Sequence, residues 1–432
     1  MDKNIAQDII KKLTSYSKYY GVVNIDGYQQ GVTRFANSQI SQNVNQSDVS
    51  VSLTLYDGKK EATCTSNVLD EEALKQLARD TEDLLAVAPP GDLEYTPNKI
   101  EEVPEIENDK DIALKYNAKG RAEAIKEGVA NLAPDLTAAG ALILEKKIAA
   151  YGNNESILFA DLDNVQFNTV VSLAESNSDG GAECLSHKVE ELDIPAAFAQ
   201  AQRRAVLGAN PNPLEGGEYT VVLSPQAVGD LVFYLTWSLN AKRIADGLSF
   251  YTDKSLTFGK NINIYDDVNN PQVYPWYFDY EGNKRQVLPL IEQGEVKNIL
   301  CDAKTGKVTG HALSNKGNGG YSLHTVMTGE DVLQGQDDMI SNIKRGLFIS
   351  ELHYTNFVNP QKLIVTGLTR NGTFLIEDGK FSKAVSTMRF TQNLLQAFNS
   401  VSAISQETAI VNSFGGWAAV MPYAVIEGFS FP

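Results

Sequence analysis

Histidine and cysteine are both scarce in this chain of 432 residues, which has four of the first and three of the second. The cysteines are odd in number and far apart, so the disulfide framework of a small secreted protein is excluded. We expect reduced, buried thiols. The histidines never share a helix face at the four-residue spacing of paired metal ligands. The three cysteines are Cys64, Cys184 and Cys301, and the four histidines are His187, His311, His324 and His353.

Long apolar runs and clusters of basic residues are also missing. No 18 consecutive residues are apolar and free of charge, so a membrane span is not expected. The 37 Lys and Arg against 54 Asp and Glu give a net charge of −17. This charge disfavours binding to nucleic acids or anionic lipids. Acidic residues in the first ten positions are atypical of a secretory signal, and we expect a cytoplasmic protein.

Several familiar site patterns are incomplete. No Gly-x-Ser-x-Gly elbow is present, and the glycine-rich segment 316–321 lacks the Gly-Lys-Ser/Thr of a phosphate loop. We expect that segment to be a mobile loop. Cys184 and His187 have a zinc-like spacing, but two ligands are too few for a structural site. We favour the interpretation that Cys184 is a core thiol and His187 a surface histidine. The aromatic run 274–278 is interpreted as packing rather than as a stacking platform.

The 43% of hydrophobic residues can bury a core divided among two or three domains. Residues 1–88 begin with a helix, because Ile5, Ile9 and Leu13 recur every four residues. Strands follow, with turns predicted at Asp26-Gly27 and Asp57-Gly58. A helix capped by Asp70 ends this N-terminal unit.

The same order of elements returns in residues 112–209. A helix is predicted around 113–132, strands over 141–188, and a closing helix that opens at Asp193. Short matching strings in 51–66 and 171–186 recur at an offset of 120 residues. We interpret the two units as an internal duplication of a helix–antiparallel strands–helix repeat, with both repeats sharing one sheet.

Two linkers separate these units from the last part of the chain. Residues 89–111 are rich in proline and acids and predict a solvated connector, and residues 210–217 form a second linker. Residues 218–432 are rich in strand and turn signals and predict an antiparallel sheet or partial barrel. Turns are expected at 281–283, 293–294, 304–306, 370–372 and 378–379. The predicted fold class is α+β.

A buried strand over 219–223 precedes Ser224-Pro225, which has the capping serine and first-turn proline of a helix start. The segment 219–231 resembles the active-site helix of the TldD/PmbA metalloprotease family, known also as modulator of DNA gyrase. Segments 246–250, 279–282 and 369–380 resemble further family signatures, so the likeness covers nearly the whole chain. In the family's catalytic branch the helix carries His-Glu-x-x-x-His.

The three functional residues of that motif, His, Glu and His, align in this chain with Pro225, Gln226 and Asp230. Pro225 has no side-chain donor atom for a metal, and Gln226 cannot accept a proton from a metal-bound water. The family's further cysteine ligand falls loosely on Asn412. A catalytic zinc typically needs three protein ligands. The resemblance is thus to the PmbA/TldE branch, which implies no catalytic residue, metal or other cofactor in this chain and zinc in a catalytic partner.

The resemblance implies a non-catalytic subunit of a TldD-type zinc metalloprotease complex that processes or degrades peptides and unfolded segments. The expected partner is a TldD-like subunit in a heterodimer, with a homodimer as the alternative, and no direct contact with nucleic acid or membrane is expected. Asp246, Ser249 and His353 are candidates for a peptide or interface region. Two other hypotheses remain: a metalloprotease whose altered site uses Asp230 and a distant histidine such as His353, and a protein-binding regulator without protease activity.

Overall fold

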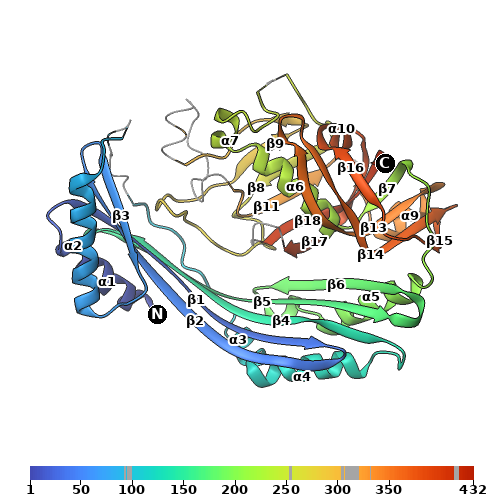
Figure 1. Cartoon of the computed structure of the whole chain (residues 1–432), viewed down its shortest axis with the longest axis horizontal. Coiled ribbons are helices and arrows are strands. Elements are labelled where there is room, and N and C mark those ends of the chain that lie inside the picture. The colour runs from blue at the N-terminus through green and yellow to red at the C-terminus, as the bar shows by residue number, and fades with distance from the viewer. Residues whose placement is uncertain are drawn as a thin grey trace.

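The computed structural model describes residues 1–91, 94, 100–252, 255–302, 306, 321–330, 332–412 and 418–432. These residues form one sheet of six strands and another of twelve, and the fold class is α+β as predicted. The six-stranded sheet is long and curved, and the C-terminal part of the chain lies over its concave side (Figure 1). Residues 316–320, His311, the predicted turn residues 304–305, and residues 413–416 after Asn412 lie outside the described residues.

Two units with the same order of elements build the six-stranded sheet. The first consists of α1 (Lys3–Ser15), β1 (Tyr20–Ala36), β2 (Gln39–Asp57), β3 (Lys60–Ser66) and α2 (Glu71–Val87). The second consists of α3 (Lys110–Lys115), α4 (Ala118–Ala130), β4 (Thr137–Gly152), β5 (Ile157–Leu173), β6 (Ser178–Ser186) and α5 (Ile194–Leu207). The helix predicted over 113–132 is therefore two helices, because the first ends at Lys115 with Tyr116 as its C-cap and Asn117 caps the start of the second.

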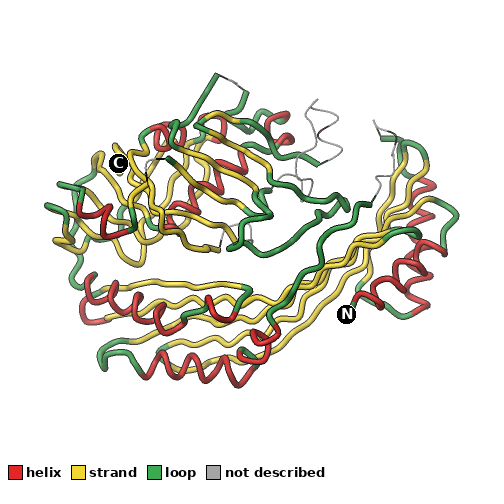
Figure 2. The backbone as a smooth tube through the Cα atoms, turned by 180° about the vertical axis from the view of Figure 1, so that it is seen from behind, coloured by secondary structure: helices red, strands yellow, loops and turns green. Residues whose placement is uncertain are grey.

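The strand order is β3-β2-β1-β4-β5-β6, and all neighbours are antiparallel. β1 and β4 join the two repeats at the centre, from Val23 opposite Gly152 to Phe35 opposite Gly140. The prediction that both repeats share one sheet is confirmed. Helices α1, α2 and α4 cover the convex face of this sheet (Figures 1 and 2).

The turn predicted at Asp26-Gly27 is wrong. Both residues lie inside β1, which pairs with β2 on one side and with β4 on the other. A Cβ on Gly27 would come within 3.3 Å of the Asp48 carbonyl oxygen, so this glycine serves close strand packing rather than chain reversal. The turn at Asp57-Gly58 is confirmed, with Gly58 at a φ of 58° between β2 and β3.

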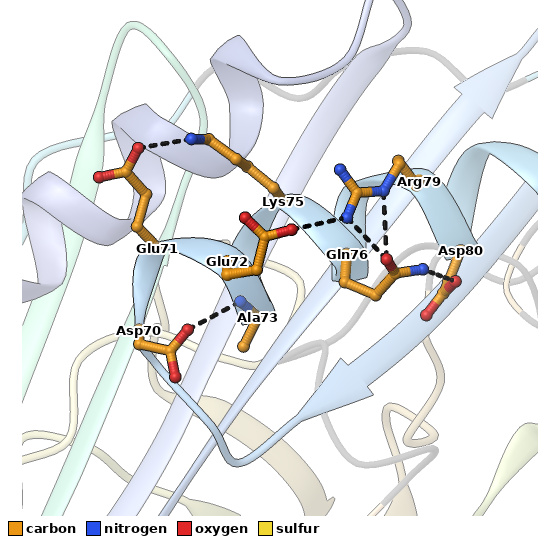
Figure 3. A network of polar contacts seen from close by, with 8 residues as sticks. All are labelled: Asp70, Glu71, Glu72, Ala73, Lys75, Gln76, Arg79 and Asp80. Atoms are coloured by element: carbon orange, nitrogen blue, oxygen red, sulfur yellow. Dashed lines mark hydrogen bonds and ion pairs between the residues drawn. The ribbon is translucent and has the colours of Figure 1, made fainter.

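Helix α2 illustrates how the surface helices are stabilised (Figure 3). The Asp70 carboxylate accepts a hydrogen bond of 2.9 Å from the backbone N–H of Ala73, as the sequence predicts for a capping residue. Lys75 forms an ion pair with Glu71 over 2.6 Å, one turn earlier. Exposed pairs of this kind contribute only about 0.3–0.5 kcal/mol each, so the helix is held mainly by its buried face, which includes Leu74, Leu77 and Leu85.

The described end of the first linker is not a free connector. Ile100, Val103 and Ile106 pack against an apolar cluster on the concave face of the six-stranded sheet. The Asn108 side-chain amide donates to the Asp161 carbonyl over 3.1 Å, and its oxygen accepts from the backbone N–H of Asp163. The segment predicted to be solvated therefore lies against β5.

The C-terminal part is a mixed sheet that contacts a central helix. Its elements are β7 (Gly217–Leu223), α6 (Pro225–Ser238), α7 (Ala241–Ala245), β8 (Ile262–Asp266), β9 (Leu288–Glu292), β10 (Glu295–Val296), β11 (Thr325–Gly329), β12 (Val332–Leu333), α9 (Gln336–Ser341), β13 (Arg345–Asn359), β14 (Ile364–Glu377), β15 (Lys380–Ala384), β16 (Arg389–Asn393), α10 (Leu394–Asn399), β17 (Val401–Asn412) and β18 (Ala418–Phe431). The main strand path runs β10-β9-β8-β11-β18-β7-β13-β14-β15 and does not close into a barrel.

The sheet is mostly antiparallel, but three pairs are parallel: β7 with β13, β11 with β18, and β12 with β17. The turn predicted at Arg370-Asn371-Gly372 is wrong, because these residues lie within β14 at an irregularity of its pairing with β13. Asn371 has a φ of 55° and Gly372 a φ of 129°. Their turn-like composition therefore reflects a strand bulge rather than a hairpin. The turns at 293–294 and 378–379 join β9 to β10 and β14 to β15, as predicted.

The aromatic run 274–278 packs the C-terminal part onto the concave face of the first sheet. Tyr274, Trp276 and Phe278 are each at most 4% exposed. They join one apolar cluster with residues of β4 and β5, which include Leu158 and Leu162. The interpretation of this run as packing is confirmed. None of the helices in the described part of the chain has the length and apolar content needed to cross a bilayer.

Candidate functional site

The degenerate motif lies where β7 passes into α6. The backbone N–H of Ser224 donates to the Ile349 carbonyl over 3.0 Å, which ties the start of α6 to β13. The Ser224 hydroxyl accepts from the backbone N–H of Ala227 and donates to the Ser350 carbonyl. Pro225 occupies the first turn, where its missing N–H costs no helical hydrogen bond. The helix start is thus held firmly by its neighbours.

A cavity of about 310 Å³ opens beside this helix start, between the second repeat and the C-terminal sheet. Pro225 and Gln226 form part of its wall. The cavity is lined by Asn168, Thr169, Val170, Ala182, Glu183, Gln200, Arg204, Ser224, Pro225, Gln226, Glu351, Leu352, Asn371, Ala409, Ile410, Val411 and Tyr423. The site therefore combines residues of β5, β6 and α5 with residues of α6, β13, β14, β17 and β18.

Three carboxyl groups gather around the cavity. Glu183 of β6 and Glu351 of β13 line it, and Asp230 follows Gln226 by one turn on the same side of α6. Burial, together with the nearby Glu351, raises the pKa of Glu183 to about 7. Burial also raises the pKa of Asp230 well above its usual value, and the charges of Glu183 and Glu351 add to this effect.

Glu351 differs from the other two carboxyl groups in its surroundings. Burial raises its pKa, but a hydrogen bond from Asn371 and the charges of Arg204 and Arg370 act in the opposite direction. The side-chain amide of Asn371 lies 2.6 Å from Glu351 Oε2. Arg204 donates to the Gly181 carbonyl over 2.6 Å. The two guanidinium groups thus offset Glu351, whereas no cation is among the groups that shift the pKa of Glu183 or Asp230.

Asn412 also belongs to this neighbourhood. Its backbone N–H donates to Glu183 Oε1 over 3.2 Å, at the end of β17. Thus Pro225 and Gln226 line the cavity, and Asn412, which is distant from them in sequence, contacts Glu183 of its wall. Asp230 lies near the same carboxyl groups. The sequence pointed to these four positions through the family resemblance alone.

The donor set does not fit a catalytic zinc. Proline supplies no ligand, and the side chains at the other motif positions are amides and one carboxylate. Among the residues that the structure describes, no three His, Cys, Asp or Glu side chains come together in a way that could hold a metal ion.

His353, one of the three candidate interface residues, contacts Arg370 rather than the motif positions. Its Nε2 lies 2.9 Å from Nη1 of Arg370, which can only donate, so the imidazole is the acceptor. Burial and the charge of Arg370 lower the pKa of His353. His353 does not line the cavity. The structure thus gives no contact between this histidine and Asp230 within the described residues.

The other two candidates make local contacts. Asp246 ends α7 and forms an ion pair with Lys242 over 2.6 Å. Ser249 is 1% exposed, donates to the Ser238 carbonyl, and accepts from the backbone N–H of Tyr251. Neither residue lines the cavity, so the three candidates do not form one site with the motif positions.

Cys184 and His187 also differ from the sequence interpretation in one respect. His187 was expected at the surface but is only 6% exposed, and its ring meets that of Tyr274 edge-on, with 5.7 Å between the centroids. Burial lowers the pKa of this histidine and raises that of the Cys184 thiol to about 12. The aromatic run covers the histidine at the junction between the two sheets, whereas Cys184 packs against the helix-side cluster that includes Tyr116 and Phe198.

Sequence reasoning missed four residues of the cavity wall: Glu183, Arg204, Glu351 and Asn371. Asn371 belongs to the family-like segment 369–380, so a signal was present but pointed to a turn. Glu183 and Arg204 lie in the second repeat, and only the packing of the repeat against the C-terminal sheet brings them to the motif. No pattern in the sequence indicates that long-range contact.

A known family model matches the part of the chain that contains the degenerate motif. Residues 216–432 match the family model described as the PmbA/TldA metallopeptidase C-terminal domain. The chain belongs to the TldD/PmbA family. The matched segment begins just before β7 and includes the degenerate motif and all of the C-terminal sheet.

The curated relatives that this chain matches are distant from it. A protein of Saccharolobus solfataricus named zinc metalloprotease TldD homolog is 22% identical over 247 residues, which is 52% of each chain. An uncharacterized protein of Methanocaldococcus jannaschii is 28% identical over 145 residues, or 32% of this chain and 35% of that protein. The chain thus matches about half or less of the length of these curated relatives.

Solved structures match over almost the full length. TldE from Thermococcus kodakarensis superposes with a TM-score of 0.84 at 16% identity and covers 99% of both chains. A Bacteroides thetaiotaomicron protein named for modulation of DNA gyrase also gives a TM-score of 0.84, at 18% identity, and covers 99% of this chain and 98% of its own. At these identities the likeness establishes the TldD/PmbA fold.

Proposed function

We propose that this chain is a non-catalytic, TldE-like subunit that pairs with a TldD-type zinc metallopeptidase subunit. The partner supplies the metal, the metal-bound water and the general base for hydrolysis of peptides or unfolded segments. This chain contributes the rest of the enclosure around the substrate. The observation that carries the proposal is the start of α6, where Pro225 and Gln226 occupy the family's motif positions on the wall of an intact cavity.

A further observation supports this function. The fold is preserved from end to end relative to the structure of TldE, so the scaffold has not decayed along with the motif. A scaffold that keeps its shape without its chemistry is typical of a subunit that acts through another chain.

The test is coexpression with a paralogue that carries an intact His-Glu-x-x-x-His motif. We expect the two chains to coelute as one complex that cleaves unstructured peptides and loses activity with a chelator. The isolated chain should bind zinc at well under one ion per molecule and cleave nothing. Chelator-sensitive cleavage by the isolated chain would contradict the proposal.

Matched variants locate the chemistry in one chain or the other. The motif Glu→Gln variant of the paralogue should abolish cleavage by the complex. The Gln226→Ala variant of this chain should leave cleavage within about twofold of wild type, because Gln226 takes no part in hydrolysis. Failure of the two chains to associate at micromolar concentration would count against the pairing itself.

A further inference from the structure

The paired strands β13, β14 and β16 lie side by side in the C-terminal sheet, and one face of them is open to solvent. Directly opposite residues share a face, so His353, Leu368 and Arg389 form a row across the three strands. The other side of β13 packs on α6, where the Phe357 ring meets that of Tyr234. We call the open side the β13 face, and its residues include His353, Tyr354, Val358, Leu368, Arg370 and Arg389.

Tyr354 is held in an unfavourable conformation that points its ring into solvent. It is 78% exposed and has a φ of 56°, which a bulky residue rarely adopts. The strand bulge is fixed on both sides, because the Tyr354 carbonyl accepts a hydrogen bond of 3.0 Å from the Asn356 side chain and the Thr355 carbonyl accepts from the Tyr234 hydroxyl. Burial of the ring does not repay this strain within the chain.

The composition of the face is that of a protein contact. An exposed tyrosine beside an arginine is typical of the residues that carry most of the binding energy at interfaces. Val358 adds an apolar contact, since it follows Phe357 in the strand, points away from α6 and is 57% exposed. The face thus offers an aromatic anchor, an aliphatic neighbour and a cation on one open surface.

The charge of the β13 face is opposite to that of the whole chain, which is −17. None of the six residues is acidic. Arg389 is exposed and forms no ion pair with a described residue. His353 adds no charge, because its Nε2 accepts a hydrogen bond from Arg370. Burial raises the pKa of Glu351, and the charge of Arg370 is among the effects that oppose it, so Arg389 is the cation left for a partner.

The charge and the position of the face indicate its occupant. Two copies of a basic face repel each other, which disfavours a symmetric contact between two copies of this chain and favours a partner that carries carboxylates. Glu351 and Leu352 of β13 line the cavity beside Pro225, and the face begins at the next residue, His353. A chain bound to the face therefore lies at the edge of the motif cavity.

We propose that the β13 face is the contact surface for the TldD-type subunit, and that a carboxylate-bearing surface of this subunit binds it, with Tyr354 as the anchor and Arg389 as the ion-pair partner. This assignment rests on the proposed function, because it gives a place to the partner named there. The pairing alone does not specify which surface of the chain is used.

The affinity of the separately purified chain for the intact-motif paralogue, measured by sedimentation velocity, tests the anchor. Tyr354→Gly should raise the Kd about tenfold or more. Its urea midpoint in the isolated chain should be unchanged or higher, because glycine adopts a positive φ without strain. Val87→Ala is the control, since Val87 of α2 is also 78% exposed, and it should bind as wild type does.

A second set of variants tests the charge. Arg389→Glu should raise the Kd about tenfold or more, whereas Arg389→Lys, which keeps the charge, should stay within about threefold of wild type. Arg345→Glu reverses an exposed charge at the start of the same strand and should have no effect. Wild-type affinity should fall between about 50 mM and about 500 mM NaCl, and this fall should be smaller for Arg389→Glu.

The outcomes separate this assignment from the proposed function. Wild-type affinity of Tyr354→Gly or of Arg389→Glu, in a complex that still forms and cleaves, would overturn the assignment and leave the pairing intact. A lowered urea midpoint of Tyr354→Gly would also overturn it, since the residue would then serve the fold. So would a homodimer of the isolated chain that both variants dissociate. Absence of any complex between the wild-type chains would contradict the proposed function and the assignment together.

Discussion

The side-chain amide of Asn371 donates a hydrogen bond of 2.6 Å to the Glu351 carboxylate, between two adjacent strands. Asn371 reaches this carboxylate from a left-handed backbone conformation, with a φ of 55°. Asparagine tolerates that conformation better than most residues. The strand irregularity therefore has a use, since it turns the amide toward the cavity.

Two substitutions of Asn371 separate the hydrogen bond from the backbone strain. Asn371→Gly should lower the free energy of unfolding by about 1.5–3 kcal/mol, because a hydrogen bond to a charged group is lost. Asn371→Ala should lower it by about 1 kcal/mol more, because alanine disfavours a positive φ. Urea denaturation measures both. Equal losses for the two variants would mean that the backbone conformation carries no strain.

The titration of Glu183 predicts a loss of stability as the pH rises. Its pKa is about 7 in the folded chain, against an ordinary value of 4.5. Between these values the folded chain keeps a proton that the unfolded chain has released. The free energy of unfolding should therefore fall from about pH 4.5 to pH 7, by at most about 1.4 kcal/mol per pH unit from this group.

A variant separates this contribution from that of other carboxyl groups. Asp279 also has a pKa of about 7, chiefly because it is buried, and it acts in the same direction. Glu183→Gln should flatten the pH dependence without abolishing it, and should be more stable than wild type at pH 8. Glu175→Gln serves as the control and should keep the wild-type slope. An unchanged slope in Glu183→Gln would show that its carboxyl titrates normally.

Arg121 and Gly31 should be energetically coupled. Arg121 is 1% exposed and donates to Thr33 Oγ1, the Tyr116 carbonyl and the side chain of Asn43. A Cβ on Gly31 would lie 2.3 Å from its Nη1. Gly31→Ala should therefore cost at least about 1 kcal/mol in the wild-type chain.

A double-mutant cycle tests this coupling. Arg121→Ala alone should cost about 2–4 kcal/mol, since it leaves several buried acceptors without a donor. Gly31→Ala should cost little when added to Arg121→Ala, because the space above the glycine is then empty. Thermal or urea unfolding of the four proteins gives the interaction energy. Additive effects would contradict the close approach.

Ser249 was a candidate for a peptide or interface region, but its contacts predict a structural role. The Ser249→Ala variant removes a buried hydroxyl that bridges the Ser238 carbonyl and the Tyr251 N–H. It should lower the free energy of unfolding by about 1–2 kcal/mol and leave assembly with a partner unchanged. Ser47→Ala, on an exposed stretch of β2, is the control. Loss of assembly at unchanged stability would restore the interface role.

Local patterns in the sequence were sufficient for much of the fold. The caps Asp70, Asp193 and Ser224 begin helices where predicted, because capping depends on a few adjacent residues. The turn-like pairs Asp26-Gly27 and Asn371-Gly372 failed, since their glycines serve close strand contact and a bulge within long strands. Local composition does not distinguish these uses from a hairpin.

The cavity could be predicted only in part. The family-like motif drew attention to Pro225, Gln226, Asp230 and Asn412. The first two line the cavity, and the last two lie near its Glu183 carboxyl group. Glu183 reaches that site only because the second repeat packs against the C-terminal sheet, and this contact joins residues more than 160 positions apart. No periodicity of the chain encodes which faces of two domains meet.

The pairing of β1 with β4 has a consequence for dissecting the protein. Each repeat contributes three strands, and the bond between repeats is a continuous antiparallel ladder between two long strands. A chain cut in the first linker would leave the N-terminal fragment with β1, and the C-terminal fragment with β4, as a bare, extended edge strand whose N–H and C=O groups are unpaired. Such edges recruit other strands. The two fragments expressed separately should therefore self-associate or precipitate. A mixture of the two fragments should reassemble into one soluble sheet.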